Sequence, residues 1–309
     1  MNRQPKRDLP ASVKNRLLAI ARHRSEELQY VMTRYAIERL LYRLSQSPHS
    51  HRFILKGATL FSGWEGGAYR PTKDLDLLGT GQNSPAALAD IFQTISQTEV
   101  APDGLFFDPE SAAAAPIREE GIYSGVRVRL VARLGKARIP LQIDVGFGDP
   151  VTPGPVVLQI PSLLDFPVPR MRAYPPESVV AEKLETLIRL GMKTSRIKDL
   201  YDLWYAASHF AFADTVLHLA VRNTFLARGT PMPSETPVAL TREFALDPSK
   251  QGLWRAFATR SGIDNPSDLD QLLELIRSFL LPVVLSQQAD PKAAWVPGGP
   301  WQQAATKAG

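Results

Sequence analysis

The sequence contains no cysteine among its 309 residues. This excludes disulfide bonds, zinc sites built from thiolates and a cysteine nucleophile. Histidine is also scarce, and of the five histidines only His49 and His51 stand close together, in a polar turn. We therefore expect no zinc site. The chain also lacks an internal repeat, a P-loop, an HExxH motif and a coherent Ser-His-Asp set.

Long apolar runs are missing as well. No stretch approaches the roughly 20 apolar residues that span a membrane, and the first residues lead into no signal-type apolar block. We therefore expect a cytoplasmic protein with no membrane partner. A hydrophobic content of 44% with 22% charged residues is ordinary for a globular protein, and the length suffices for one large domain or two.

The chain is basic, with a formal net charge of +5 and a pI of about 9.4. Such a surplus is compatible with a polyanionic partner, although many enzymes carry a similar charge. The placement of the charge is more informative. Three arginines, Arg127, Arg129 and Arg133, alternate with apolar residues in one expected strand, which is more typical of a solvated sheet face than of a binding row.

Asp74 and Asp76 lie in a short apolar run that we predict to be a strand. Because side chains alternate across a strand, both carboxylates share one face, while Leu75 and Leu77 share the other. Two carboxylates held one pleat apart repel each other near a core unless a cation lies between them. Hard oxygen ligands at this spacing suit Mg²⁺ (or Mn²⁺), which usually takes one or two carboxylates plus substrate phosphates.

A glycine turn precedes this acidic strand. Gly57 ends an apolar run and is followed by Ala58 and by Thr59, where a short helix is expected. Glycine lets the backbone approach a phosphate, and a helix start offers free N–H groups. A DxD pair alone is a weak signal, since most such pairs are solvated loop residues. Its place inside an apolar run after a glycine turn favours a nucleotide–metal site.

Two alternating runs, 126–133 and 139–147, predict a β-hairpin. Asp144 is a lone carboxylate between apolar residues of the second run. Nucleotidyl transfer needs a third carboxylate that helps to hold the metal beneath the acceptor hydroxyl, and a strand beside the acidic strand could supply it. The alternative is an ordinary outward-facing aspartate. Asp149, slightly further on, is interpreted as a turn residue.

Helical periodicity covers residues 12–44 and returns after a proline-rich connector at 151–176, where we place the domain boundary. The helix that opens after this connector carries Lys183 beside its buried stripe. Glu185 and Arg189 are spaced for an exposed helical pair.

A further helix begins near residue 195 with cations in its first turn. Arg196 and Lys198 occupy positions at which the helix dipole disfavours positive charge. Free backbone N–H groups together with two cations attract an anion, so we infer a phosphate-binding corner here. Asp199 and Asp202 follow on one edge of the helix, where they orient these cations, assist the chemistry or simply balance charge.

Taken together, these motifs resemble a bacterial family, the AbiEii/AbiGii toxin-type nucleotidyltransferases. These are the toxin halves of toxin–antitoxin and abortive-infection systems. The resemblance extends over about residues 12–282, and the residues that carry it lie at 55–59, 70–78, 143–145, 181–185 and 195–202.

The resemblance implies roles for particular residues. Mg²⁺ is expected at Asp74 and Asp76, with Asp144 as the third carboxylate. Lys183 matches the family's motif lysine, which meets the phosphates of the NTP, and Asp199 matches its last acidic position. The sequence departs from the family at one point. The Gly-Ser of the glycine motif is here Gly-Ala-Thr at 57–59, so a hydroxyl contact to the phosphates would have to come from the threonine.

The resemblance also implies an α+β fold, with a small mixed-sheet nucleotidyltransferase core between helical flanks. The expected segments are an N-terminal helical segment (1–48), the core (49–160), a helical domain that completes the nucleotide site (161–285) and a flexible tail (286–309). The expected reaction transfers a nucleoside monophosphate from an NTP to an RNA, above all to the 3′ end of tRNA, and so blocks translation. A cognate antitoxin is the expected partner.

Three rival functions stay open at this point. The same site can modify a protein side chain instead of RNA. A nucleotide-sugar transferase also uses a DxD with a metal, although the corner of Lys183, Arg196 and Lys198 argues against it. The third rival is a non-catalytic module that binds RNA or an antitoxin.

Overall fold

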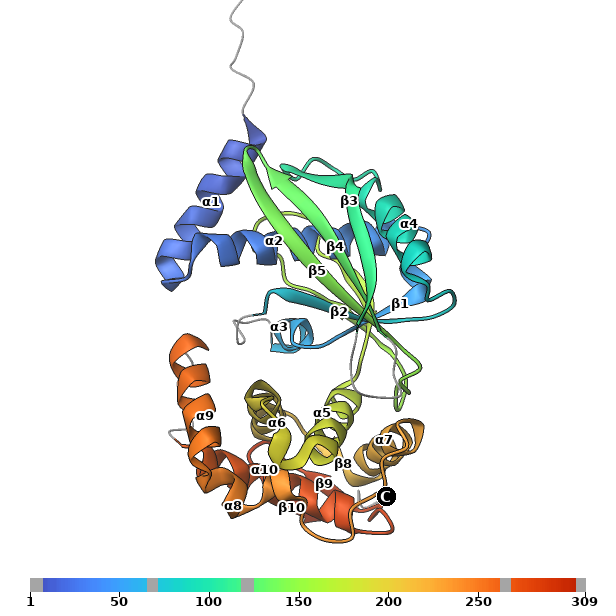
Figure 1. Ribbon diagram of the computed structural model, residues 1–309, viewed down its shortest axis with the longest axis vertical. Helices are drawn as coiled ribbons and strands as arrows, with labels where there is room; N and C mark the ends of the chain where they lie inside the picture. The colour runs from blue at the N-terminus through green and yellow to red at the C-terminus, as the bar shows by residue number, and fades with distance from the viewer. Residues whose placement is uncertain (1–7, 66–71, 118–124, 262–267, 304–309) are drawn as a thin grey trace, which may run out of the picture. The chain divides into compact units, whose positions relative to one another are not determined.

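The computed structural model describes residues 8–65, 72–117, 125–261 and 268–303 (Figure 1). The chain divides into two compact units, and each is described by itself. Unit 1 comprises Met1–Gly148 and Val156–Ala173, and unit 2 comprises Asp149–Pro155 and Tyr174–Gly309. The boundary expected between residues 160 and 161 falls inside unit 1. After a short passage through unit 2 at Asp149–Pro155, the chain returns to unit 1 at Val156–Ala173 and adds two strands to its sheet.

Unit 1 is built on a mixed sheet whose strands take the order β3-β4-β5-β2-β1-β7-β6. Strands β2 and β5 pair parallel, as do β1 and β7, and the other neighbours pair antiparallel. The strands are β1 (Phe53–Lys56), β2 (Asp74–Gly79), β3 (Leu105–Ile117), β4 (Gly125–Leu134), β5 (Ala137–Phe147), β6 (Val156–Gln159) and β7 (Arg170–Ala173).

Helices cover one face of this sheet. Helix α2 packs against β5, and α4 packs against β3 and β4, with α1 lying on α2 (Figure 1). The N-terminal pair breaks at Ser25, which adopts a left-handed conformation with φ of 54°. The helices of unit 1 are α1 (Leu9–Arg24), α2 (Leu28–Gln46), α3 (Thr59–Glu65) and α4 (Pro85–Ser96).

The predicted hairpin is confirmed as β4 and β5, joined at Gly135 with φ of +57°. Val126, Val128 and Leu130 are buried on the helix side, while the arginines of β4 alternate to the other face. The sequence pattern did not predict β3, which contains four consecutive alanines and two prolines. A bulge interrupts β3 between Asp108 and Ala113, and its position at the sheet edge tolerates proline.

Unit 2 is mainly helical. The predicted helices are present, and the last long one continues through Pro282 instead of ending there. The elements are α5 (Pro176–Leu190), α6 (Ile197–His209), α7 (Asp214–Ala227), α8 (Arg242–Leu246), α9 (Pro248–Ser261), α10 (Leu269–Leu285) and the short strands β8 (Phe212–Ala213), β9 (Ala293–Trp295) and β10 (Trp301–Gln303).

The segment after α10 is packed against the helices. Trp295 is 1% exposed, and its Nε1 donates to the carbonyl of Ala207 at 2.7 Å. Trp301 donates in the same way to the carbonyl of Phe279 at 3.0 Å. The expectation of a flexible tail from residue 286 is therefore wrong as far as residue 303, and residues 304–309 lie outside the described residues.

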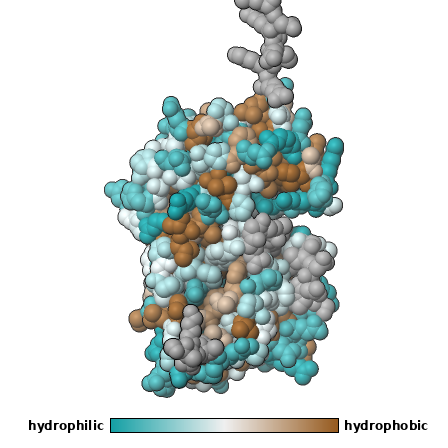
Figure 2. All heavy atoms as spheres, turned by 180° about the vertical axis from the view of Figure 1, so that it is seen from behind, coloured by the Kyte–Doolittle hydropathy of each residue, from teal (hydrophilic) through white to brown (hydrophobic). Residues whose placement is uncertain are grey.

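Within the described ranges, no helix combines the length and the apolarity needed to cross a bilayer. Seen from behind, hydrophobic side chains form separate patches among hydrophilic ones (Figure 2). Large exposed apolar side chains occur in both units, for example Phe106 and Leu226.

We expect Trp295→Ala to lower the free energy of unfolding by about 3–5 kcal/mol, because it leaves a large cavity beside α10 and removes one of the two hydrogen bonds that the carbonyl of Ala207 accepts, the other being donated by the backbone N–H of Gly298. Leu226→Ala, at a side chain that is 83% exposed in the same unit, should change it by less than about 0.5 kcal/mol. Urea titration followed by circular dichroism measures both values. Equal small changes would mean that the segment does not stabilise unit 2.

Candidate functional site

Three carboxylates lie on one face of two neighbouring strands in unit 1. Strand β2 pairs parallel with β5, in a register that sets Asp76 directly opposite Asp144. Leu75 and Leu77 are buried, whereas Asp74 and the two opposed aspartates are half-buried. The predicted alternation along the acidic strand is therefore correct, and the strand that joins it brings in the third carboxylate.

A cation stands at each end of this row of paired residues. Strand β1 sets Lys56 opposite Asp76, and β4 sets Arg127 opposite Asp144. Across β1, β2, β5 and β4 the row therefore reads cation, carboxylate, carboxylate, cation. The Arg127 guanidinium donates from Nε to Asp144 Oδ1 at 2.8 Å and from Nη2 to Oδ2 at 2.7 Å. Such a two-point pair is stronger and more directional than a single hydrogen bond.

The sequence analysis missed the role of Arg127 and treated it as one residue of a solvated row. A signal for this pair is present in the hairpin. The turn pairs Leu134 with Ala137, and seven residues further along each strand Arg127 meets Asp144. Counting outward from a two-residue turn therefore predicts this pair without any structure.

Gly57 makes room for one of the carboxylates. Its φ is +76°, and a Cβ added there would lie 2.1 Å from Asp76 Oδ2. A residue with a side chain at this position would therefore displace Asp76. The sequence analysis explained this glycine by the approach of a phosphate, and the structure supplies a different reason within the chain itself. Ala58 is buried, and Thr59 begins α3.

The carboxylate oxygens of this group are ligands that a hard divalent cation prefers. Asp74 and Asp76 share one face of a strand, and a Mg²⁺ site needs only one or two carboxylates when substrate phosphates complete it. Both oxygens of Asp144, however, accept hydrogen bonds from Arg127. Within the part of the chain that the structure describes, no three His, Cys, Asp or Glu side chains are grouped so that they could hold a metal ion. The donor chemistry fits a cation, but the predicted site of three carboxylates is not preformed.

In unit 2, Lys183 on α5 contacts two carboxylates of α6. Its Nζ lies 2.7 Å from Asp199 Oδ1 and 2.6 Å from Asp202 Oδ2. The lysine side chain is 13% exposed, and both carboxylates are buried. The predicted site residues Lys183 and Asp199 are therefore in direct contact, in an ion pair that is largely shielded from water.

Arg196 joins the same group from the N-cap of α6. Its Nε donates to Asp199 Oδ2 at 2.5 Å. Burial would raise the pKa of Asp199, but Lys183 and Arg196 hold that pKa well below its ordinary value. With Asp202 included, two cations face two carboxylates, so the expected excess of positive charge is cancelled within the group. Lys198 is exposed, and its side chain makes no hydrogen bond or ion pair with any described residue.

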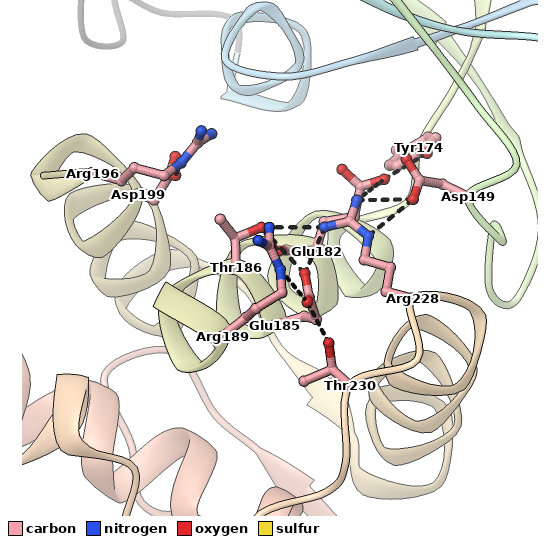
Figure 3. Close-up of polar contacts among 10 residues, drawn as sticks. All are labelled: Asp149, Tyr174, Glu182, Glu185, Thr186, Arg189, Arg196, Asp199, Arg228 and Thr230. Atoms are coloured by element: carbon pink, nitrogen blue, oxygen red, sulfur yellow. Dashed lines mark hydrogen bonds and ion pairs between the residues drawn. The ribbon is translucent and has the colours of Figure 1, made fainter. Parts of the chain in front are cut away.

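A second buried network surrounds Arg228, at the C-terminal end of α7 (Figure 3). Its Nε and Nη2 donate to Asp149 Oδ1 at 3.0 and 2.8 Å, and its Nη1 donates to Glu185 Oε2 at 2.8 Å. Glu182 lies 3.5 Å from Nη2 and accepts from the hydroxyl of Tyr174. The network ties α7 to α5, the helix that carries Lys183. The sequence shows no signal for Arg228, because its partners are far away along the chain.

The interpretation of Glu185 and Arg189 as an exposed pair is wrong. Glu185 is fully buried, not exposed, and it accepts hydrogen bonds from Arg189 at 2.9 Å and from Thr230 at 2.6 Å in addition to Arg228. Asp149 lies after the end of β5, outside any helix or strand, as expected for a turn residue, but its side chain is 5% exposed and paired with Arg228. Helical spacing correctly predicted the Glu185–Arg189 pair, but spacing alone does not reveal which side of a helix meets another helix.

Comparison with known proteins finds a family and two solved structures. The family model described as "Nucleotidyl transferase AbiEii toxin, Type IV TA system" matches residues 39–275. One solved structure, described as a candidate nucleotidyltransferase from H. pylori, is 16% identical, covers 83% of this chain and 95% of its own, and has a TM-score of 0.46. The other, JHP933 from Helicobacter pylori, is also 16% identical, with coverages of 79% and 90% and a TM-score of 0.41. The comparison with curated proteins gives no match.

We expect Gly57→Ala to lower the free energy of unfolding by about 1–3 kcal/mol, because the new methyl group collides with Asp76 and the backbone is left-handed there. Gly252→Ala, inside α9 with no atom within 4 Å of the added Cβ, should raise it by up to about 1 kcal/mol. Urea unfolding of the two variants measures the contrast. A Gly57→Ala protein as stable as the parent would refute this packing.

Glu185→Gln should lower stability by about 3 kcal/mol near pH 7, because it removes a buried charge from Arg228 and Arg189. Burial alone would raise the pKa of Glu185, but the hydrogen bonds from Thr230 and Arg228 outweigh it and hold the pKa below its ordinary value of 4.5. The stabilisation is therefore complete above pH 4.5 and is lost as the pH falls through the folded pKa.

The difference between wild type and Glu185→Gln should accordingly shrink below pH 4.5. Urea titrations from pH 7 to pH 3 measure it, with Glu274→Gln on the exposed side of α10 as the control. A difference that stays constant over this range would contradict a charged Glu185 in the folded protein.

Proposed function

Because the chain belongs to the AbiEii family of nucleotidyl transferase toxins, we propose that its nucleotidyl transfer uses RNA as the acceptor, with the 3′ end of tRNA as the principal target. The observation that carries the proposal is the row of carboxylates on β2 and β5. Asp76 and Asp144 face each other across two strands, and Asp74 lies on the same face. In the reaction, the terminal hydroxyl oxygen bonds to the α-phosphorus of the NTP, pyrophosphate leaves and the hydroxyl proton is lost.

The carboxylates have distinct roles in this proposal. Asp74 and Asp76 would hold Mg²⁺ or Mn²⁺, which neutralises charge on the transferring phosphoryl group and favours loss of the acceptor proton. Asp144 is kept beside them by Arg127, with both of its oxygens oriented. An oriented carboxylate next to the acceptor hydroxyl favours the ionised form of that hydroxyl. Gly57 keeps the space that the Asp76 carboxylate occupies.

For unit 2, we assign the binding of the NTP phosphates to Lys183 and Arg196. Asp199 accepts from both cations and so fixes their distance from each other. We therefore assign Asp199 as a positioning residue and not as a metal ligand. Asp202 fulfils the same purpose for the lysine alone.

Adding a nucleotide to the 3′ end of tRNA removes the hydroxyl that accepts an amino acid, which accounts for a toxic outcome. Membership of a type IV toxin–antitoxin family implies an antitoxin partner. The proposal also places the toxic activity in the chemistry of the carboxylates, so that their loss should make the protein harmless to its host.

We expect Asp74→Asn and Asp76→Asn each to reduce nucleotide transfer by at least about 100-fold, because an amide would hold the divalent cation more weakly, and with it the positive charge that balances the phosphates at the reacting centre would be lost. The assay incubates the protein with each α-labelled NTP, Mg²⁺ and total cellular RNA and separates the products on a gel. Asp90→Asn, at an exposed aspartate of α4 in the same unit, is the matched control and should label RNA as the parent does.

Label in a tRNA-sized band that disappears in both site variants supports the proposal. Label confined to protein would replace it with nucleotidylation of a side chain. Undiminished labelling by Asp74→Asn would remove the acidic strand from the mechanism. Urea unfolding of each variant, with changes below about 0.5 kcal/mol, verifies that the fold is intact.

A further inference from the structure

The face of the sheet that the helices leave uncovered carries a set of arginines. Arg127, Arg129 and Arg133 alternate along β4, and Arg138 on β5 lies directly opposite Arg133. Val128, Leu130 and Ala132, which alternate with them, are buried on the helix side, and Val131 lies on the same face as the arginines. We call these four arginines, together with Phe106, the arginine face.

This face is open to solvent. Arg129, Arg133 and Arg138 are all exposed. Their neighbours on β3 are small, since Ala113 pairs with Arg129 and Ala115 pairs with Arg127, and both alanines are exposed. The guanidinium groups therefore project beyond the small side chains of the neighbouring strand. Helices α2 and α4 of unit 1 pack on the other side of the sheet, so within unit 1 a ligand can reach these arginines from this side.

Some of the positive charge on this face is not balanced. Arg127 is paired with Asp144, and Arg133 lies 3.4 Å from Asp108. By contrast, the side chains of Arg129 and Arg138 make no hydrogen bond or ion pair with any described residue. Glu110, in the bulge of β3, is a further exposed acid nearby, and Lys136 in the hairpin turn adds a cation.

The arginine face is continuous with the carboxylates. Arg127 belongs to the row of Asp76 and Asp144, and Arg129 belongs to the next row, opposite Gln142. From the row of Arg127 to the row of Arg133 and Arg138 the strand extends over six residues, or roughly 20 Å. If the terminal hydroxyl of an acceptor lies at the carboxylates, the rest of its chain must run from there over the surface of the protein. Its phosphates are repelled by the aspartates and attracted by the arginines.

An aromatic side chain stands at the far end. Phe106 is 58% exposed and pairs with Arg133 across β3 and β4. The two side chains line a hollow of about 690 Å³ beside the start of α1. Basic tracks combined with exposed aromatic rings are typical of surfaces that bind single-stranded nucleic acid, because bases stack on the rings while the backbone follows the cations.

We propose that the arginine face binds the single-stranded 3′ segment of the acceptor RNA and leads its terminal hydroxyl to the carboxylates. This inference rests on the proposed function and adds the surface that holds the substrate. An acidic protein partner is less well matched, because the cations form a narrow line that ends at the reacting groups. The sequence analysis favoured a solvated face, and the small neighbouring side chains, the unpaired guanidiniums and the continuity with the carboxylates now argue against that interpretation.

The test uses the double variant Arg129→Gln/Arg138→Gln and a 12-nucleotide single-stranded RNA of mixed sequence with a fluorophore at its 5′ end. Fluorescence anisotropy measures its Kd at several salt concentrations. We expect the Kd to rise about tenfold and the slope of log K against log salt to fall by about 1.4, or about 0.7 for each lost phosphate contact. Arg255→Gln/Arg260→Gln, which removes two exposed arginines from α9, is the control and should match the parent.

A second arm measures transfer from α-labelled NTP to total RNA. The double variant should raise the RNA concentration at half-saturation and leave the KM for NTP and the rate at saturating RNA unchanged. Equal Kd values and salt slopes in the two double variants would overturn the inference. So would displacement of the RNA by polyglutamate of equal charge as readily as by unlabelled RNA. If the parent labels no RNA, the proposed function fails, and the binding arm still decides the role of this face.

Discussion

The site depends on placing two carboxylates directly opposite each other on neighbouring strands. Like charges in such a pair destabilise a sheet, yet Asp76 and Asp144 face each other across β2 and β5. The register offsets this cost by setting Lys56 and Arg127 at the two ends of the same row. Gly57 adds the steric condition, since it alone leaves room for the Asp76 carboxylate. The acidic site is therefore a property of four strands in one register, not of the acidic strand by itself.

In unit 2 as well, charged side chains are balanced by partners of opposite sign, and there they are more deeply buried. Lys183 and Arg196 are balanced by Asp199 and Asp202, and Arg228 is balanced by its own set of carboxylates. Charges removed from water are costly unless each is paired and hydrogen-bonded, so these groups persist because every partner is present. An anion that binds Lys183 or Arg196 has to compete with carboxylates already in contact. If phosphates bind here as proposed, this competition would lower their affinity below that for free cations and would favour a ligand with several negative charges.

The periodicity of apolar residues correctly predicted those features of the fold that depend on spacing within a single helix, strand or hairpin. The alternation in β2, the hairpin of β4 and β5 and the stripes of the long helices all follow from spacing within one element. Contacts between distant segments do not. Glu185 meets Arg228 across 43 residues, so a pattern that looked like an exposed helical pair proved to be buried. The strands β6, β7 and β9 have only three or four residues each, so that even the alternation present in β7 does not identify a strand by itself, and they form because an existing sheet edge or a buried tryptophan stabilises them. The family resemblance pointed to the acidic positions, whereas the pair of Arg127 with Asp144 follows from the register of the hairpin, which the sequence analysis did not count out from the turn.

Arg127 belongs to two surfaces at once. It pairs with Asp144 in the carboxylate row, and it is the first member of the arginine face. The guanidinium of Arg127 carries one charge, which Asp144 neutralises in the ion pair. A cation that binds Asp144 in its place would free Arg127 to attract a phosphate. A phosphate that binds Arg127 would in turn free Asp144 to attract a cation. Any such effect is reciprocal, because the change in affinity at one site equals the change at the other. If a cation and an RNA bind as proposed, the two surfaces would be coupled through this single ion pair, so that binding at the carboxylates and binding along β4 would favour each other.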